Sequence, residues 1–316
     1  MHDLAVVVPS MNDGGWLKAL LPTIDAAHGE ISFEVVIADV ESRDETREVA
    51  GRYDFTRVVP VINAGFAHAN NVAAATTDAR YVLYLNADTE IVDGTLADLV
   101  HAMDDRPGVG LASVRQLTAD GRIYPTMRRF ATPGRRLAEA LGSERFAPHY
   151  GQRILDLELY GREMACDWTT GAFMFVRREA LQSAGQLDER FFFTAEEQDL
   201  CLRIHQAGWE VRHLTQLTIV HHAGKRGIDA RFAQQSAFAE MQLATKHFGP
   251  LRRRAFQAAL ALNHGMRLGS PSRARRHAAR GALEATLGRR GSPFRDPPPT
   301  ATPPGQTARA RAGEPA

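Results

Sequence analysis

Short β-rich runs alternate with helical segments through the first third of the chain, and this alternation constrains the fold more than any other feature. Apolar runs that end in Pro, Asp or Asn are typical of buried strands. Strands separated by single helices are joined by right-handed crossovers and form a mostly parallel sheet. The sequence therefore predicts an α/β fold with strands at Leu4–Val8, Phe33–Ala38, Thr56–Ile62, Tyr81–Leu85 and Val109–Val114, and helices at Trp16–Ala27, Glu45–Tyr53, Ala67–Thr76 and Thr95–Met103.

The middle of the chain, Gln116–Cys166, has scattered Gly, Pro and Arg and no clear periodicity. A long irregular segment in a compact domain usually serves as a lid or a binding element, so we expect the acceptor to bind here. Regular patterns return after it. They predict strands at Ala172–Val176, Val211–His213 and Leu217–His221, and helices at Arg178–Ala184, Glu197–Gln206, Ala230–Phe248 and Arg252–Leu268.

Charge is unevenly distributed along the chain. The whole sequence carries a net charge of +1, but 13 arginines and three acidic residues follow Gly249, a local excess of +10. We divide the chain into a catalytic α/β domain (1–249), a basic helical extension (250–290) and a Pro- and Ala-rich tail (291–316) that is predicted to be disordered, because it has few large apolar residues. The extension suits contact with an anionic membrane through its apolar residues, or it is simply a solvated basic surface. Those apolar residues are Phe256, Leu260, Leu262, Met266 and Leu268.

The location of the protein is inferred from what the sequence lacks. Its two cysteines, Cys166 and Cys201, lie among apolar residues and are expected to be buried thiols rather than a disulfide framework. The N-terminus, MHDLAVVVPS, has no basic region before its short apolar run, so we expect no signal peptide. No apolar run approaches the roughly 18 residues of a membrane span. We expect a cytoplasmic protein, with peripheral contact on the inner face of the cell membrane.

Polar residues follow the predicted strands, at the edge where ligands of parallel sheets bind. Asp39 could accept hydrogen bonds from a ribose or a base, or form an Asx turn. Gly65 would let the backbone approach a ligand closely. Asp88 is well placed to hold Mg²⁺ or Mn²⁺ against a diphosphate, since both ions prefer oxygen ligands, and His221 could complete the metal shell.

Three acidic residues, Glu196, Glu197 and Asp199, lie at the start of a predicted helix and follow the aromatic run Phe191–Phe193. Acidic residues in the first turn stabilise the helix dipole, which accounts for one or two of them. A carboxylate beside an apolar wall would also have a raised pKa and could act as a general base. Both roles fit the pattern.

Eight short motifs between Leu4 and Gly227, in order, resemble glycosyl transferase family 2, in particular the bacterial rhamnosyltransferase-like group. They include VPSMN (residues 8–12), ADVESRDET (38–46), NAGFA with Asn70-Asn71, LNAD (85–88), DWTTGA (167–172), GQLDERFF (185–192) and EEQDLCLR (196–203). This resemblance implies a GT-A type, Rossmann-like three-layer sandwich with a mostly parallel central sheet, followed by C-terminal helices and a disordered tail.

The resemblance also implies roles for individual residues. Glu197 takes the position of the catalytic base, where the family usually has Asp, and the adjacent Glu196 is the alternative. Asp88 and His221 would hold Mg²⁺ or Mn²⁺, and Asp39 would contact the base and ribose. Val40 and Glu41 depart from the usual nucleotide loop, which leaves the nucleotide open. Contacts to the nucleotide sugar are expected from Pro9, Ser10, Asn12, Asp39, Asn63, Gly65, Phe66, Asn70, Asn86, Trp168 and Gly171.

The implied reaction is metal-dependent, inverting transfer of a sugar, with dTDP-rhamnose as the suggested donor, to a glycan or lipid-linked acceptor in cell-envelope polysaccharide synthesis. A sugar nucleotidyltransferase is an alternative, but it needs a basic Gly-rich loop after the first strand, and residues 9–16 contain no Arg or Lys. A non-catalytic sugar-nucleotide-binding module would be indicated by loss of Asp88 or of the acidic cluster, and both are present. No nucleic-acid-binding module accompanies the basic tail, so nucleic acid is not an expected partner.

Overall fold

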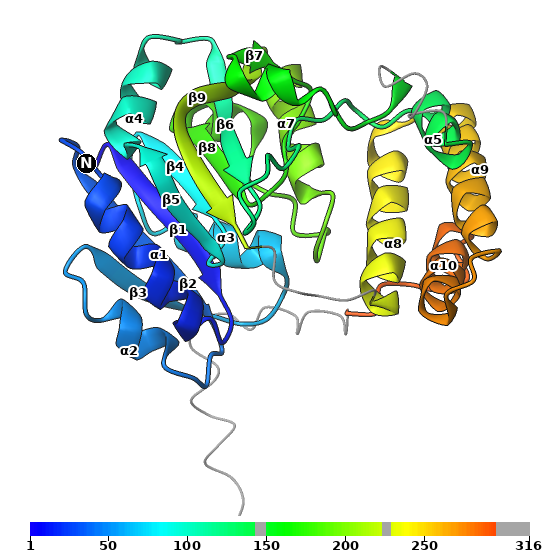
Figure 1. Ribbon diagram of the computed structural model, residues 1–316, viewed down its shortest axis with the longest axis horizontal. Coiled ribbons are helices and arrows are strands. Elements are labelled where there is room, and N and C mark those ends of the chain that lie inside the picture. Colours follow the sequence, from blue (N-terminus) through cyan, green and yellow to red (C-terminus); the bar gives the residue numbers. More distant parts are fainter. Residues whose placement is uncertain (143–149, 223–228, 295–316) are drawn as a thin grey trace, which may run out of the picture.

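A computed structural model of the protein describes residues 1–142, 150–222 and 229–294. Its centre is a nine-stranded sheet with strand order β3-β2-β1-β4-β8-β6-β9-β5, to which β7 adds by pairing with β9 (Figure 1). The strands are β1 (Leu4–Ser10), β2 (Phe33–Val40), β3 (Thr56–Val61), β4 (Tyr81–Leu85), β5 (Thr89–Gly94), β6 (Val109–Leu117), β7 (Met164–Ala165), β8 (Phe173–Arg177) and β9 (Glu210–His221).

The sheet is mostly parallel, as predicted. In the described part of the chain, β1, β2, β3, β4, β6 and β9 run in one direction, and β5, β7 and β8 run against them. The carboxyl ends of β1 to β4 and of β9 therefore lie along the same edge. Because β8 is antiparallel to β4, the segment that enters β8 also reaches this edge, with Phe173 opposite Leu85.

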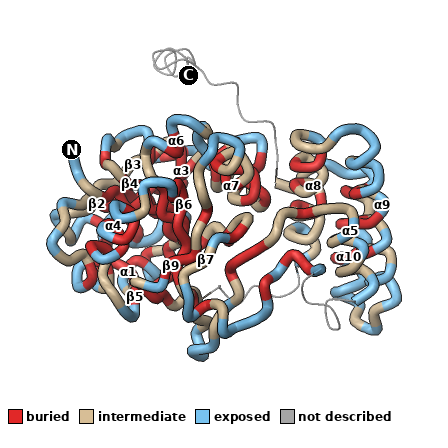
Figure 2. The backbone as a smooth tube through the Cα atoms, turned by 90° about the horizontal axis from the view of Figure 1, so that it is seen from above, coloured by how far each residue is buried: buried red, intermediate tan, exposed pale blue. Residues whose placement is uncertain are grey.

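Helices cover both faces of the sheet and complete the predicted three-layer sandwich. On one face lie α1 (Gly14–Ala27), α2 (Thr46–Ala50) and α4 (Leu96–Asp104); on the other lie α3 (Phe66–Ala74), α6 (Arg178–Ala184) and α7 (Glu196–Gln206). Successive strand residues point to opposite faces. Val6 packs with the α1 side and Val7 with the α3 side. Figure 2 shows this buried core along the central strands.

Four further helices pack together beside the sandwich, next to α7 (Figure 1). They are α5 (Pro133–Ala140), α8 (Ala230–His247), α9 (Pro250–Arg267) and α10 (Arg273–Thr286). Phe256 and Leu260 of α9 form an apolar cluster with Ala131 and Ala244, and alanines of α8 and α10 form another. This bundle draws on residues from both sides of Gly249, so the division of the chain at that residue remains a proposal.

The structure differs from the sequence prediction in several elements and at the end of the described chain. Strand β5, helix α5 and the separate helix α10 were not expected. Residues 291–294, which we predicted to be disordered, pack on the body of the protein: the Phe294 ring stacks on Phe192 at 5.8 Å between centroids, and the Arg231 guanidinium lies 4.5 Å from its centroid. Hydrogen bonds from Arg231 and Gln234 to backbone carbonyls of the segment, and one from Ser292 to Gln235, add to these aromatic contacts. The rest of the predicted tail, 295–316, lies outside the described residues.

Cys166 and Cys201 are free and buried, as expected. Among the helices that the structure describes, none is both long enough and apolar enough to cross a membrane.

Candidate active site

The loops after β1 and β2 are tied to each other at the edge of the sheet. Asn12 accepts a hydrogen bond from the Arg43 amide at 2.8 Å through Oδ1, and its own amide donates to Ser42 Oγ at 2.9 Å. Both Asn12 and Glu41 have left-handed backbone conformations, with φ of 58° and 54°. Pro9 and Ser10 lie in β1 opposite Ala38 and Asp39, so the two predicted groups of nucleotide-binding residues are neighbours.

Asp39 is fully buried at the end of β2. Its Oδ2 lies 2.6 Å from Nε of the largely exposed Arg47, and its Oδ1 accepts a hydrogen bond from the Ser42 amide at 3.2 Å. Asp39 therefore bonds the backbone three residues further on, and this bond is not the Asx turn that the sequence offered as an alternative. A nucleotide contact through Asp39 stays a prediction, and the Ser10 hydroxyl beside it is buried with no hydrogen-bond partner among the described residues.

Gly65 allows a close approach between two loops of the protein. Its φ is 107°, and a Cβ atom there would lie 2.4 Å from the carbonyl oxygen of Phe192. The Phe66 amide donates to the same oxygen at 2.8 Å. Asn70 is buried in α3 and donates to the Phe66 carbonyl at 2.9 Å, while Asn71 bridges to Leu187. Gly65 thus places the start of α3 against the segment that leads into α7.

Replacing Gly65 with alanine is expected to destabilise the protein by roughly 2–3 kcal/mol, because the new methyl group would have both a strained φ and a clash with backbone. Urea denaturation followed by circular dichroism measures this change. Gly15→Ala is the control, since a Cβ at Gly15 meets nothing within 4 Å and alanine favours the helix. Equal stability of the Gly65 variant and the wild type would show that the loops separate easily.

Asp88 and His221 meet where β4 and β9 end. Asp88 Oδ1 lies 3.3 Å from His221 Nε2, and the register places Thr89 opposite His221. Asn86 precedes Asp88, and its amide donates to the Ala172 carbonyl at 3.0 Å. Next to this pair, His222 is 2.6 Å from Glu90 and its ring stacks on Trp16.

The donor set at Asp88 and His221 fits a cation that shares its coordination with a substrate. No group of three or more His, Cys, Asp or Glu side chains suited to a metal occurs in the described residues. One carboxylate and one imidazole leave most positions around Mg²⁺ or Mn²⁺ for phosphate oxygens and water, which is common for these ions. Asn63, by contrast, is exposed, and its Nδ2 contacts Met11 Sδ at 3.8 Å.

Glu196 and Glu197 begin α7 directly after Thr194 and Ala195, whose φ angles of 66° and 72° are left-handed. Glu196 is buried and Glu197 is half-buried. The Oε2 atom of each is shielded from solvent and has no hydrogen-bond partner in the described part of the chain. Burial raises the pKa of Glu197 to about 6, and burial together with the Glu197 charge raises the pKa of Glu196 well above its ordinary value.

Gly171 and Phe66, which were predicted separately from the sequence, come together beside Glu197. A Cβ at Gly171 would lie 3.9 Å from Glu197 Cβ and 3.9 Å from Phe66 Cε1. Trp168, which is three residues before Gly171, is fixed by a 3.0 Å hydrogen bond from Nε1 to the Arg129 carbonyl. Gly171 directly precedes Ala172, whose carbonyl bonds the Asn86 amide at the end of β4, so Glu197 lies at the same edge of the sheet as Asp39 and Asp88.

Arg128 is a residue of this site that sequence reasoning missed. It is buried, its guanidinium lies 5.9 Å from the Trp168 ring centroid, and it hydrogen-bonds the carbonyls of Pro125 and Met127. Its positive charge lowers the pKa of Glu197 against the larger effect of burial. The available signal was a pair of arginines followed by Phe130 in an otherwise irregular segment.

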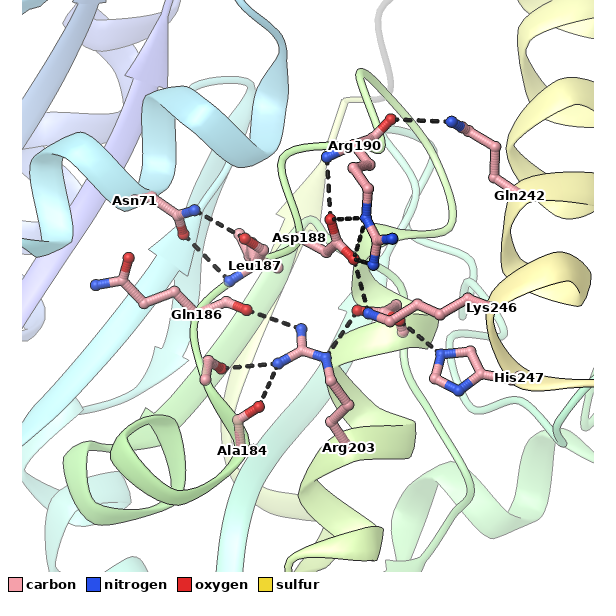
Figure 3. A network of polar contacts seen from close by, with 12 residues as sticks. Asn71, Ala184, Gln186, Leu187, Asp188, Arg190, Arg203, Gln242, Lys246 and His247 are labelled. Carbon is pink, nitrogen blue, oxygen red and sulfur yellow. Dashed lines mark hydrogen bonds and ion pairs between the residues drawn. The ribbon is translucent and has the colours of Figure 1, made fainter.

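Asp199, the third acid of the cluster, holds helices together. It lies 2.8 Å from Arg203, 2.6 Å from Lys246 and 2.7 Å from His247, and so joins α7 to α8 (Figure 3). Burial alone would raise the pKa of Asp199, but the hydrogen bond from His247 and the nearby cations hold it below its ordinary value. This leaves Glu196 and Glu197 as the candidates for a base.

Residues 5–183 match the family described as "Glycosyl transferase family 2". The chain belongs to this family. It is 29% identical over 275 residues to the N-acetylglucosaminyl-diphospho-decaprenol L-rhamnosyltransferase of Mycobacterium tuberculosis, which covers 79% of this chain and 88% of that protein. It is 22% identical to the rhamnosyltransferase WbbL of Escherichia coli, over 69% of this chain and 83% of that one.

A third relative is much longer. The O-antigen biosynthesis protein RfbC of Myxococcus xanthus is 26% identical over 72% of this chain, which spans only 18% of RfbC. Among solved structures, the mannosyltransferase PcManGT from Pyrobaculum calidifontis, in complex with GDP-Man and Mn²⁺, gives a TM-score of 0.54 at 19% identity, over 91% of this chain and 74% of that one. S. aureus TarS 1–349 gives 0.51 at 15% identity, over 90% of each chain. These similarities confirm the GT-A fold.

Proposed function

We propose that this glycosyltransferase moves a sugar from a nucleotide-diphosphate donor to a hydroxyl group of its acceptor, with inversion at the anomeric carbon. The observation that supports this most is the Glu197 carboxylate, which is shielded, has a raised pKa and lies at the sheet edge that also carries Asp39 and Asp88. A carboxylate with a pKa near working pH is an efficient general base.

In the proposed reaction, Glu197 takes the proton of the acceptor hydroxyl as its oxygen forms a bond to the anomeric carbon. The bond from that carbon to the diphosphate oxygen breaks on the opposite face, and the nucleotide diphosphate leaves with the electron pair. A single displacement inverts the configuration and needs no covalent enzyme intermediate. Mg²⁺ or Mn²⁺ held by Asp88 and His221 would supply charge neutralisation to the leaving diphosphate.

The rate of transfer is expected to fall below about pH 6, since a base must be ionised and the pKa of Glu197 is raised to about 6. Protonation at lower pH removes the base, and above pH 6 the rate should level off. The acid limb of a pH profile of kcat, measured with saturating substrates, tests this. A profile still flat at pH 4.5 would rule out a base with a raised pKa.

We propose rhamnose, from its dTDP donor, as the sugar and a lipid-linked glycan of the cell envelope as the acceptor. Support comes from two relatives whose names include rhamnosyltransferase. The name of one of them also specifies a diphospho-decaprenol acceptor. Because sequence identity to those proteins is modest, the nucleotide of the donor has to be determined by experiment. A sugar nucleotidyltransferase or a non-catalytic sugar-nucleotide-binding module are the alternatives, and the second would bind a nucleotide sugar without turnover.

Peripheral contact with the inner, cytoplasmic face of an anionic membrane stays a prediction. Phe256 and Leu260, two of the apolar residues behind it, are buried within the helical bundle. Leu262, Met266 and Leu268 are exposed, and they support the proposal because they lie among arginines. Sedimentation with anionic vesicles tests it: equal binding by the wild type and by Leu262→Gln/Met266→Gln would count against contact through α9.

The proposed function is tested by nucleotide-diphosphate release from dTDP-, UDP- and GDP-sugars in the presence of Mg²⁺ or Mn²⁺. We expect slow hydrolysis of one donor that stops when EDTA is added. If no donor is hydrolysed and calorimetry detects no binding of any nucleotide diphosphate, the transferase proposal fails. Binding without hydrolysis or transfer would favour the non-catalytic module.

A further inference from the structure

A cavity of about 670 Å³ lies outside the candidate active site, between α8, α9 and the end of α10. The segment Arg190–Phe191 forms its remaining wall. Five cationic side chains from four parts of the chain line it, and no acidic side chain does: Arg190, Lys246, Arg253, Arg289 and Arg290. Figure 3 shows the side chains of Arg190 and Lys246 both directed at Asp188.

The cations of this cavity are only partly neutralised by neighbouring carboxylates. Arg190 and Lys246 both pair with Asp188, and Arg290 pairs with Glu284. In the described ranges, neither Arg253 nor Arg289 forms an ion pair. Two guanidinium groups, on helix α9 and just after α10, are therefore available to an anion that enters the cavity. Guanidinium groups match the geometry of phosphate oxygens especially well.

Other groups in the wall indicate that the ligand is more than a simple ion. Gln242 donates to the Arg190 carbonyl at 3.2 Å, while its Oε1 atom is buried and has no partner in the described part of the chain. A hydroxyl group of a ligand could donate to that oxygen. Phe191, Phe238 and Met241 add apolar wall. The cavity thus suits an organic phosphate that carries hydroxyl groups and apolar atoms.

The cavity is physically connected to the start of α7, where Glu197 lies. Phe191 is buried and packs with Ala195, immediately before α7, and with Leu243 of α8. Lys246 contacts Asp199 in the first turn of α7 as well as Asp188 below the cavity. Two residues of the cavity wall, Phe191 and Lys246, therefore contact the elements that position the candidate base.

We propose that this cavity binds the phosphate or diphosphate group of the acceptor, while the sugar of the acceptor reaches Glu197. The proposal rests on the proposed transferase function. It assigns a role to two arginines of the basic extension, Arg253 and Arg289. It also makes the acceptor an organic phosphate rather than a neutral glycan.

Calorimetric titration of the full chain with inorganic pyrophosphate tests the site directly. EDTA is present throughout, so that a metal at Asp88 does not contribute. Arg253→Gln/Arg289→Gln should bind about tenfold more weakly or worse, because charge-assisted hydrogen bonds are lost. The matched control is Arg254→Gln/Arg275→Gln, which removes the same charge from exposed positions of α9 and α10 that do not line the cavity. Equal affinity of the two double variants would overturn the site.

A second arm tests what the site is for. A water-soluble sugar diphosphate with a short prenyl chain should displace pyrophosphate, and Arg253→Gln/Arg289→Gln should raise KM for this acceptor with kcat and acceptor-free donor hydrolysis unchanged. If pyrophosphate binds in the cavity but the prenyl diphosphate does not displace it, the site takes a free anion and the acceptor assignment is wrong. Absence of donor hydrolysis in the wild type would instead be a failure of the transferase proposal, which pyrophosphate binding does not measure.

Discussion

Replacing Glu197 with glutamine is expected to lower kcat for sugar transfer by about 10²–10⁴-fold, the range that a positioned general base contributes. Glutamine keeps the size of the side chain but cannot accept the proton of the acceptor hydroxyl. The Glu197 carboxylate receives hydrogen bonds from the backbone at Ala195 and Glu197, and the amide oxygen of glutamine can accept the same bonds, so the substitution is conservative. Steady-state kinetics with saturating donor and acceptor measure the loss, and calorimetry should show unchanged nucleotide binding.

Glu196→Gln is the matched control for this prediction. Glu196 is buried, and burial together with the Glu197 charge raises its pKa well above the ordinary value, which favours the neutral form that a glutamine amide resembles. We expect its activity to stay within a few-fold of the wild type. If Glu196→Gln is inactive and Glu197→Gln is not, the base is Glu196, and the assignment of roles in this pair must be reversed.

Replacing Asp88 with asparagine is expected to lower transfer by on the order of 10²-fold or more, since charge stabilisation by a bound cation is worth several kcal/mol. The amide keeps the shape of the side chain but loses the charge that would hold Mg²⁺ or Mn²⁺. A measurement that does not depend on activity is calorimetry. It gives the affinity for a nucleotide diphosphate, first in the presence of Mn²⁺ and then in the presence of EDTA. The wild type should bind more tightly with Mn²⁺, and Asp88→Asn should show no difference.

Glu90→Gln provides the control for Asp88, because Glu90 is a carboxylate at the same edge that pairs with His222 rather than His221. We expect Mn²⁺ to strengthen nucleotide binding in this variant as in the wild type. An Asp88→Asn protein that keeps its response to Mn²⁺ would mean that the cation binds elsewhere or that the reaction needs none.

The central strands could be predicted from the sequence because each is a continuous apolar run with a clear boundary, as at Tyr81–Leu85. Strand β5 could not, since Thr89–Gly94 contains two acidic residues and is a strand only through its pairing with β9. Helix α5 was missed because it has only eight residues, none of them buried, and lies in a segment with scattered Gly, Pro and Arg. In both cases tertiary context decides the structure.

The candidate site was partly predictable for a topological reason. Parallel strands end at one edge, which identified Asp39 and Asp88 as candidates from the sequence, whereas Glu197 was identified from the acidic cluster beside an aromatic run and from the family resemblance. The packing of Gly65 against Phe192 and the buried charge of Arg128 depend on loops far apart in the sequence. The cationic cavity could not be predicted from the sequence either, because Arg190, Arg253 and Arg289 come together only when the helical bundle packs.

The most direct test of the account is the configuration of the product. The purified chain would be given the donor identified by hydrolysis and a short-chain sugar-diphospho-lipid, and proton NMR would determine the anomeric configuration of the new glycosidic bond. The account predicts a configuration opposite to that of the donor, and no product above background with Glu197→Gln. A product that retains the donor configuration, or one formed equally well by Glu197→Gln, would contradict single displacement with Glu197 as the base.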